Sequence, residues 1–141
     1  MDLRPALDFI RQRNQGVLTT IRANGRPQLS NILYALGDDD VARISVTDSR
    51  AKTANLRRDP RASLYVLGDS FWQYVVLEGK VDVSPVAADP HDDTVEQLIA
   101  LYRAGQGKEH PDWDEFRMAM VSQGRMVATL AATRAYGMLG S

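Results

Sequence analysis

The sequence predicts a mainly β fold, an antiparallel barrel that is closed or nearly closed, with helices on its outside. Runs rich in β-branched and aromatic residues recur along the chain, and glycine, asparagine and aspartate turns separate them. Other segments carry apolar residues at helical spacing. About five or six strands on a meandering path, with helices outside, favour a barrel.

The individual elements follow from local patterns. Leu3, Leu7 and Ile10 recur at helical spacing and predict a short first helix. The pair Asn24-Gly25 lies between two β-rich runs and favours a tight hairpin, because both residue types tolerate positive φ. The same signals predict helices over 3–13, 50–58, 92–103 and 111–122, and strands over 16–22, 27–36, 41–47, 62–67, 74–83 and 125–133.

Composition excludes several classes of function. The length of 141 residues is normal for one domain, so we expect residues 1–141 to form a single barrel domain. A net charge of -1 gives no basic field for nucleic acid, and the absence of cysteine excludes disulfides and thiolate catalysis. No apolar run has the length of a signal peptide or a membrane span. We therefore expect a cytoplasmic protein with neither nucleic acid nor membrane as a partner.

The densest group of candidate ligands lies within residues 45–61. Ser45 and Thr47 are two apart on a predicted strand, so their hydroxyls share one face. The strand leads into a helix that we expect Ser49 to cap, and the first amides of a helix attract anions. The cationic side chains nearby are Arg50, Lys52, Arg57, Arg58 and Arg61. A phosphate would meet all these donors, although a capped and solvated basic helix has the same pattern.

A second group of polar residues lies on the return strand of the hairpin. Gln28 and Ser30 face the same way on that strand, whereas Asn31 faces the other. Polar residues within an apolar strand usually bond to something, and the ring carbonyl and NH groups of a flat heterocycle would suit them. Exposure at a sheet edge is the alternative.

The remaining residues that could carry chemistry are less informative. Phe71, Trp72 and Tyr74 could wall a flat cofactor, or else belong to the core or an interface. His91 and His110 lie far apart and no metal spacing joins them, so we expect no metal site. The sequence has no phosphate-binding glycine loop and no nucleophile elbow, and it identifies no catalytic residue.

Two segments resemble a known family. The run from Gly16 to Asn31 resembles the opening hairpin of the pyridoxamine 5′-phosphate oxidase-like split β-barrel proteins. The run over 50–63 resembles their phosphate-binding helix. Glu78-Gly79 and the segment 92–113 are similar to the branch that uses the deazaflavin coenzyme F420 rather than FMN. The resemblance covers nearly the whole chain.

This resemblance implies a six-stranded antiparallel split β-barrel and a homodimer that holds the cofactor in a groove between its subunits. The residues implied to line the phosphate and its linker are Ser45, Thr47, Arg50, Lys52, Thr53 and Asn55. Those implied to approach the ring system are Gln28, Ser30 and Asn31, with Trp72, Tyr74 and Val75 contributed by the partner subunit. The cations Arg57, Arg58 and Arg61 are expected to meet the glutamate tail of coenzyme F420, which FMN lacks.

The implied activity is that of an oxidoreductase dependent on coenzyme F420. Its reaction is hydride transfer from C5 of the reduced deazaflavin to an activated double bond of a small molecule, such as an enone or a quinone. Two alternatives stay open. An FMN-dependent enzyme of the pyridoxamine phosphate oxidase type needs further basic residues near the C-terminus, where only Arg125 and Arg134 lie. A non-catalytic F420-binding protein would explain the lack of an obvious proton donor.

Overall fold

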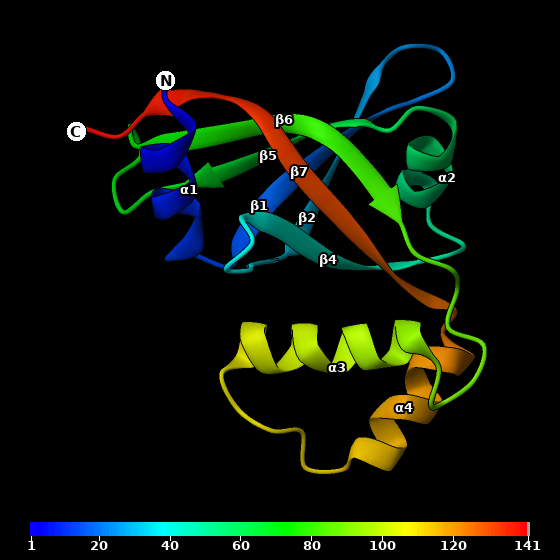
Figure 1. Cartoon of the computed structure of the whole chain (residues 1–141). Helices are drawn as coiled ribbons and strands as arrows, with labels where there is room; N and C mark the ends of the chain where they lie inside the picture. Colours follow the sequence, from blue (N-terminus) through cyan, green and yellow to red (C-terminus); the bar gives the residue numbers. More distant parts are fainter. Residues whose placement is uncertain (141) are drawn as a thin grey trace.

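The computed structural model describes residues 1–140 and shows a curled antiparallel sheet with helices outside it (Figure 1). The strands are β1 (Gln15–Ile21), β2 (Pro27–Leu33), β3 (Ala35–Leu36), β4 (Val41–Thr47), β5 (Arg61–Leu67), β6 (Tyr74–Val83) and β7 (Arg125–Met138). The helices are α1 (Leu3–Arg11), α2 (Ala51–Arg58), α3 (Asp93–Gln106) and α4 (Trp113–Ser122). The mainly β fold expected from the sequence is confirmed, with seven strands in place of six.

The extra strand arises where the expected return strand over 27–36 is interrupted. The Tyr34 amide donates to the Asn14 carbonyl, and the chain then pairs with β4 through residues 35–36. The resulting strand order is β2-β1-β5-β6-β7-β4-β3. Within residues 1–140 the two outermost strands, β2 and β3, are not hydrogen-bonded to each other, so the barrel is open along β2.

Strand β7 joins the two halves of the sheet. It pairs with β6 from Tyr74↔Met138 to Val83↔Ala128, and with β4 from Val41↔Ala131 to Thr47↔Arg125. The strand runs beyond the expected end at residue 133, to Met138, and it is longer than β6. A bulge between Glu78 and Gly79 shifts the register. A Cβ at Gly79 would lie 2.2 Å from the Ala131 carbonyl oxygen, so only glycine fits there.

The core fills the inside of the curled sheet. Leu18, Ile44, Leu64, Leu77 and Leu130 are at most 1% exposed and come from five different strands. Burial of each such side chain stabilises the fold by about 1.5–3 kcal/mol. Helix α1 covers one end of the barrel and α2 the other (Figure 1). The third and fourth helices lie against β3, β4 and β7.

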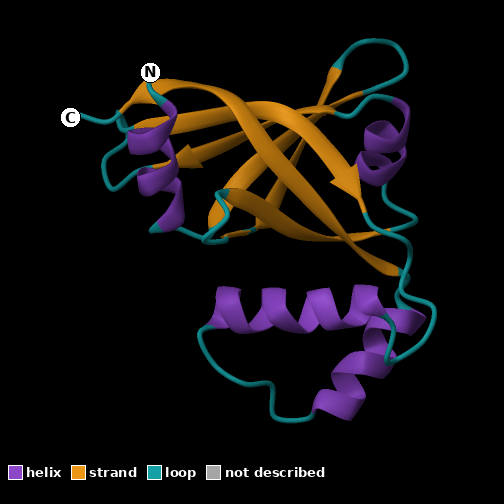
Figure 2. Cartoon of the chain, in the orientation of Figure 1, coloured by secondary structure: helices purple, strands orange, loops and turns teal. Residues whose placement is uncertain are grey.

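Helices α3 and α4 form a separate layer against the barrel (Figure 2). Val95, Leu98 and Ile99 of α3 pack with Val127 of β7 in a second, smaller core. The Asp92 side chain caps α3 by accepting from the Val95 amide. The α3–α4 layer therefore covers one side of the sheet without closing it.

None of the helices in residues 1–140 is both long and apolar enough to cross a membrane.

Candidate functional site

A cationic pocket of about 420 Å³ lies between β2, β4 and the start of α2. Its lining residues are Gln28, Ser30, Ser45, Val46, Thr47, Arg50, Ala51, Lys52 and Arg125. The structure thus brings together two groups that the sequence presents separately, the polar residues of the hairpin and those around the α2 helix. Alternation along β2 explains why Gln28 and Ser30 enter the pocket together.

The charges in this pocket are all positive. Its lining contains Arg50, Lys52 and Arg125 and no aspartate or glutamate. Burial lowers the pKa of Lys52, and the neighbouring charges of Arg50 and Arg125 lower it further. The Arg125 guanidinium lies 3.4 Å from the Ser45 hydroxyl and donates to Gln123 Oε1 at 3.0 Å. Three cations with hydroxyl groups beside them suit a phosphate or another multiply charged anion.

Arg125 is a site residue that sequence reasoning missed. It is the first residue of β7 and lies opposite Thr47 in the β4–β7 pairing. That long-range register carries it to the pocket. The sequence gives only the weak signal of a basic residue at the start of the last predicted strand.

Helix α2 begins differently from the prediction. Ser49 does not cap it, because the N-cap is Arg50, whose side chain makes no capping hydrogen bond. The Thr47 carbonyl anchors the start instead, since it accepts from the Thr53 hydroxyl at 2.7 Å and from the Arg50 amide at 3.1 Å. The first turn of α2 reaches the pocket through residues 51 and 52, and leading helix amides favour anions.

Three residues expected at the cofactor hold α2 in place. Thr53 is fully buried, and its hydroxyl donates to the Thr47 carbonyl. Asn55 is 7% exposed and donates to Thr20 Oγ1 at 3.1 Å and to Gln28 Oε1 at 2.6 Å. Arg58 donates to Asn55 Oδ1 and to the carbonyl of the last β1 residue. Their side chains therefore position the helix and orient Gln28 within the pocket.

Two further cations of α2 and β5 already have carboxylate partners. Arg57 lies 2.7 Å from Asp48, and Arg61 lies 2.8 Å from Asp59. Hydrogen bonds from Arg61 hold the pKa of Asp59 at about 2. These pairs weaken the expectation that Arg57 and Arg61 meet a glutamate tail.

Asn31 and Val75 do not line the cationic pocket. Asn31 lies on the other face of β2 and lines a shallow groove with Tyr65. Val75 is fully buried in the barrel core, so its side chain cannot reach a ligand at the surface of this chain.

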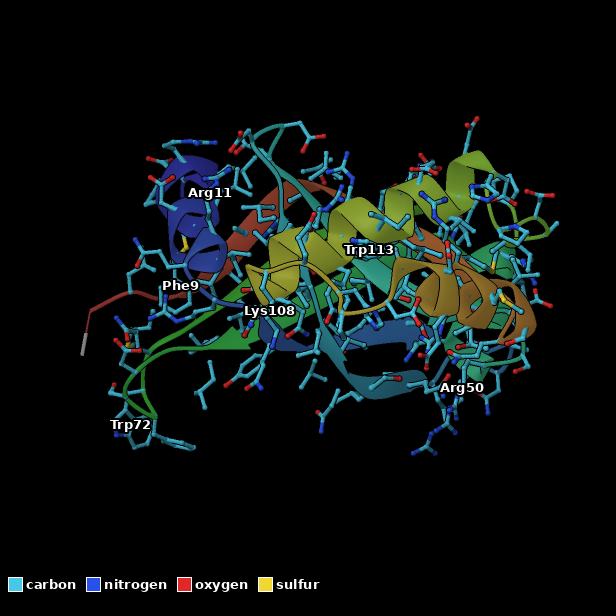
Figure 3. All side chains as sticks on the ribbon, turned by 90° about the horizontal axis from the view of Figure 1, so that it is seen from below. Phe9, Arg11, Arg50, Trp72, Lys108 and Trp113 are labelled. Atoms are coloured by element: carbon cyan, nitrogen blue, oxygen red, sulfur yellow. The ribbon has the colours of Figure 1, made fainter. Side chains whose placement is uncertain are left out.

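Trp72 and Tyr74 also lie away from the pocket. Trp72 is 69% exposed in the turn after β5, and Figure 3 places it at the opposite end of the molecule from Arg50. Tyr74 stacks on Tyr65 with ring centroids 5.6 Å apart. Within one chain, neither ring contributes to the cationic pocket.

The chain matches the family model described as pyridoxamine 5′-phosphate oxidase over residues 5–133. The chain belongs to the pyridoxamine 5′-phosphate oxidase family. The resemblance seen in the sequence is thereby confirmed, and with it the split-barrel type of fold. Membership supports oxidoreductase chemistry with a flavin or deazaflavin cofactor in general terms.

Solved structures share this family fold. An F420 reductase is 24% identical, with a TM-score of 0.67, and the match covers 92% of this chain and 94% of that one. A conserved hypothetical protein of Mycobacterium tuberculosis is 24% identical, with a TM-score of 0.73 and coverage of 96% and 82%. A heme binding protein of Mycobacterium smegmatis is 23% identical, with a TM-score of 0.67 and coverage of 96% and 54%. At these identities the likeness shows the fold alone.

In this family member a second, apolar cavity adjoins the cationic pocket. It measures about 270 Å³ and lies between the barrel and the α3–α4 layer. Its lining residues are Asn14, Leu33, Tyr34, Ser45, Leu98, Leu101, Tyr102, Gly105, Gln106, Phe116, Met120 and Arg125. Ser45 and Arg125 line both spaces, so the two lie next to each other at these residues. The sequence could not reveal this cavity, since it depends on how α3 and α4 pack against the barrel.

Proposed function

We propose that this chain is a reductase dependent on coenzyme F420, which catalyses hydride transfer to an activated double bond of a small molecule. The observation that carries the proposal is the junction of a cationic pocket with an apolar cavity at Ser45 and Arg125. A reductase whose cofactor binds by its phosphate requires an apolar space beside the phosphate site, where a substrate can meet the cofactor ring. The donor set of the pocket fits the phosphate, because it has three cations and no carboxylate.

The residues of the pocket have distinct roles in this proposal. Arg50 and Lys52 would hold the phosphate, with the hydroxyls of Ser45 and Thr47 beside them, and Arg125 lies at the junction with the apolar cavity. The Asn55 amide fixes Gln28, so that its side chain is already oriented when the cofactor enters. The bound cofactor would supply the hydride chemistry. The protein would position the cofactor and line the site with apolar side chains that exclude part of the water. No residue is assigned as a proton donor.

The preference for the deazaflavin over FMN has separate support. The sequence resembles the branch that uses coenzyme F420, and one structural neighbour is named an F420 reductase. Arg50 is an exposed cation at the edge of the pocket and can meet negative charge beyond the phosphate. FMN ends at its phosphate and has no tail charge for Arg50 to meet.

The proposal includes a homodimer. The outer face of β1, β2, β5, β6 and β7 carries exposed apolar side chains, among them Leu29, which is 63% exposed, and Tyr136, which is 47% exposed. A second copy on this face would bury them, and the partner subunit's Trp72 and Tyr74 would complete the cofactor groove. Light scattering should give a dimer mass at micromolar concentration, and Leu29→Asp should shift it toward the monomer. A monomer mass for the parent chain would overturn the shared groove.

The cofactor assignment is tested by titrating the purified protein with coenzyme F420 and with FMN. We expect Lys52→Ala to weaken F420 binding by about 1.5–3 kcal/mol, the worth of a hydrogen bond to a charged group. Lys80→Ala removes an exposed lysine of β6 outside the pocket and should bind like the parent. Equal F420 affinity of the Lys52 variant and the parent would refute the phosphate site.

Two outcomes favour the alternatives. Tighter binding of FMN, with a yellow purified protein, would replace the proposal by an FMN-dependent enzyme. Tight F420 binding with no turnover of a panel of enones and quinones would indicate a protein that carries the cofactor.

A further inference from the structure

The apolar cavity has features that the binding of a phosphate does not explain. Its wall includes the apolar side chains of Leu33, Leu98, Leu101, Phe116 and Met120, which come from β2, α3 and α4. Tyr34 also lines the cavity, although it is only 2% exposed and its hydroxyl donates to the Ile10 carbonyl at 2.7 Å. The cavity is thus an apolar space with its own walls rather than an extension of the cationic pocket.

Arg125 is the one charged residue that lines this cavity among residues 1–140. It lies at the junction with the cationic pocket, and contacts with Ser45 and Gln123 hold its guanidinium in place. No aspartate or glutamate lines the cavity, so a cationic occupant would find no partner. A fixed guanidinium at the end of an apolar space suits a carboxylate, since its planar fork matches carboxylate geometry.

Gly105 is a second feature that points to an occupant. It lies in the last turn of α3 and lines the cavity, and a Cβ built on it meets no atom within 4 Å. Glycine within a helix costs roughly 0.5–1 kcal/mol relative to alanine, and neither packing nor a positive φ requires it here. Any larger side chain at this position would project into the open space. The glycine therefore keeps the cavity open at some loss of helix stability.

We propose that this cavity is the substrate pocket and that it takes a small, flat, apolar molecule with one carboxylate, which Arg125 receives. Its role in turnover rests on the proposed function, whereas binding of the molecule does not. A volume of about 270 Å³ is slightly below the usual range of drug-sized pockets, which indicates a compact substrate. The α3–α4 layer thereby determines which molecules reach the cofactor.

The experiment uses 2-naphthoate as a probe and 2-naphthalenemethanol as its neutral counterpart, without any cofactor. Calorimetric titration should show that the carboxylate binds at least tenfold more tightly than the alcohol. NMR should show shifts of the methyl groups of Leu33, Leu101 and Met120. Absent binding, or equal affinity for the two probes, would overturn the proposal.

Variants of α3 test the location. Gly105→Trp should lower naphthoate affinity at least tenfold, and the smaller Gly105→Leu provides the same block with less risk to folding. Ala104→Trp places the same ring on the neighbouring exposed position of α3 and should bind the probe like the parent. Unchanged naphthoate affinity in both Gly105 variants would place the probe elsewhere and refute the pocket.

A final titration separates this proposal from the cofactor assignment. Saturating coenzyme F420 should leave naphthoate bound, because the two occupy different spaces. Displacement of naphthoate by the cofactor would show that the cavity belongs to the cofactor ring, and the substrate pocket would be refuted. If the chain binds no F420 at all, the proposed function fails while the naphthoate titrations still decide whether the cavity binds carboxylates.

Discussion

The side-chain amide of Asn55 donates to the side-chain oxygen of Gln28 at 2.6 Å and so joins helix α2 to the edge strand β2. The same amide donates to the buried Thr20 hydroxyl, and its oxygen accepts from Arg58. One buried residue therefore connects the hairpin, the helix and the wall of the cationic pocket.

Replacement of Asn55 by alanine should destabilise the fold. Thr20 and Gln28 would lose their donor, and a buried polar group without a partner costs about 1–3 kcal/mol. Urea denaturation of Asn55→Ala should show a loss of that size. Gln97→Ala removes an exposed amide side chain from α3 and should stay within about 0.5 kcal/mol of the parent. Equal stabilities of the two variants would contradict the structural role of Asn55.

Binding of phosphates should depend on pH through Lys52. Burial and the charges of Arg50 and Arg125 lower its pKa from the ordinary value of about 10.4. Only the ammonium form attracts an anion, so affinity should be full at neutral pH and fall as the pH rises through the lowered pKa. Phenyl phosphate is a suitable ligand, because its charge is constant well above its second pKa of about 6.

The control for this titration is Lys52→Arg. Arginine stays protonated over the alkaline range in which lysine titrates, so the decline should disappear in the variant. An affinity of the parent that does not change over that range would show that Lys52 does not contact the anion.

Release of Arg57 from Asp48 should strengthen the attraction for a charged tail. Asp48→Asn removes the partner of Arg57 at 2.7 Å, and an exposed charge contact is worth about 0.2–1 kcal/mol. The variant should bind F420 with long glutamate tails a few-fold more tightly at low salt, and the gain should shrink at high salt. Asp93→Asn, an exposed change on α3, is the matched control. No gain at low salt would mean that Arg57 does not reach the tail.

Two glycines should respond in opposite ways to alanine. A Cβ at Gly79 would lie 2.2 Å from the Ala131 carbonyl oxygen, so Gly79→Ala must move the bulge between β6 and β7. We expect a loss of at least about 2 kcal/mol, as for other strained backbone sites. Gly105→Ala should leave stability unchanged or raise it, because its Cβ meets nothing. Thermal melting compares the two variants, and a stable Gly79→Ala protein would contradict the packing of the bulge.

Local patterns predicted much of the fold. The strands over 41–47 and 74–83 have the expected bounds, because both are rich in β-branched and other apolar residues and follow polar turns. The hairpin at Asn24-Gly25 is also present, although only Gly25 has a positive φ. The expected cap at Ser49 is wrong, since the Thr47 carbonyl and the Thr53 hydroxyl fix the start of α2.

The parts of the site that sequence reasoning missed depend on distant pairings. Arg125 enters the pocket through the register of β7 against β4, and no local pattern encodes that register. The partners of Arg57 and Asn55 likewise come from separate elements. Sequence reasoning therefore named most of the residues that line the cationic pocket, but not which of the nearby cations have a carboxylate partner.

The double pairing of β7 also has a consequence for how the chain folds. Strand β4 pairs along its whole length only with β7, because its pairing with β3 involves only two residues of β3. Strand β7 lies between β6 and β4, so β4 is not joined to the rest of the sheet until β7 pairs with it. Helix α2 and the cationic pocket then border an incomplete sheet. Non-local pairings of this kind slow folding, because closing a long loop costs chain entropy before the stabilising contacts form. A refolding experiment should therefore show the hairpin of β1 and β2 protected from hydrogen exchange before the residues of β4.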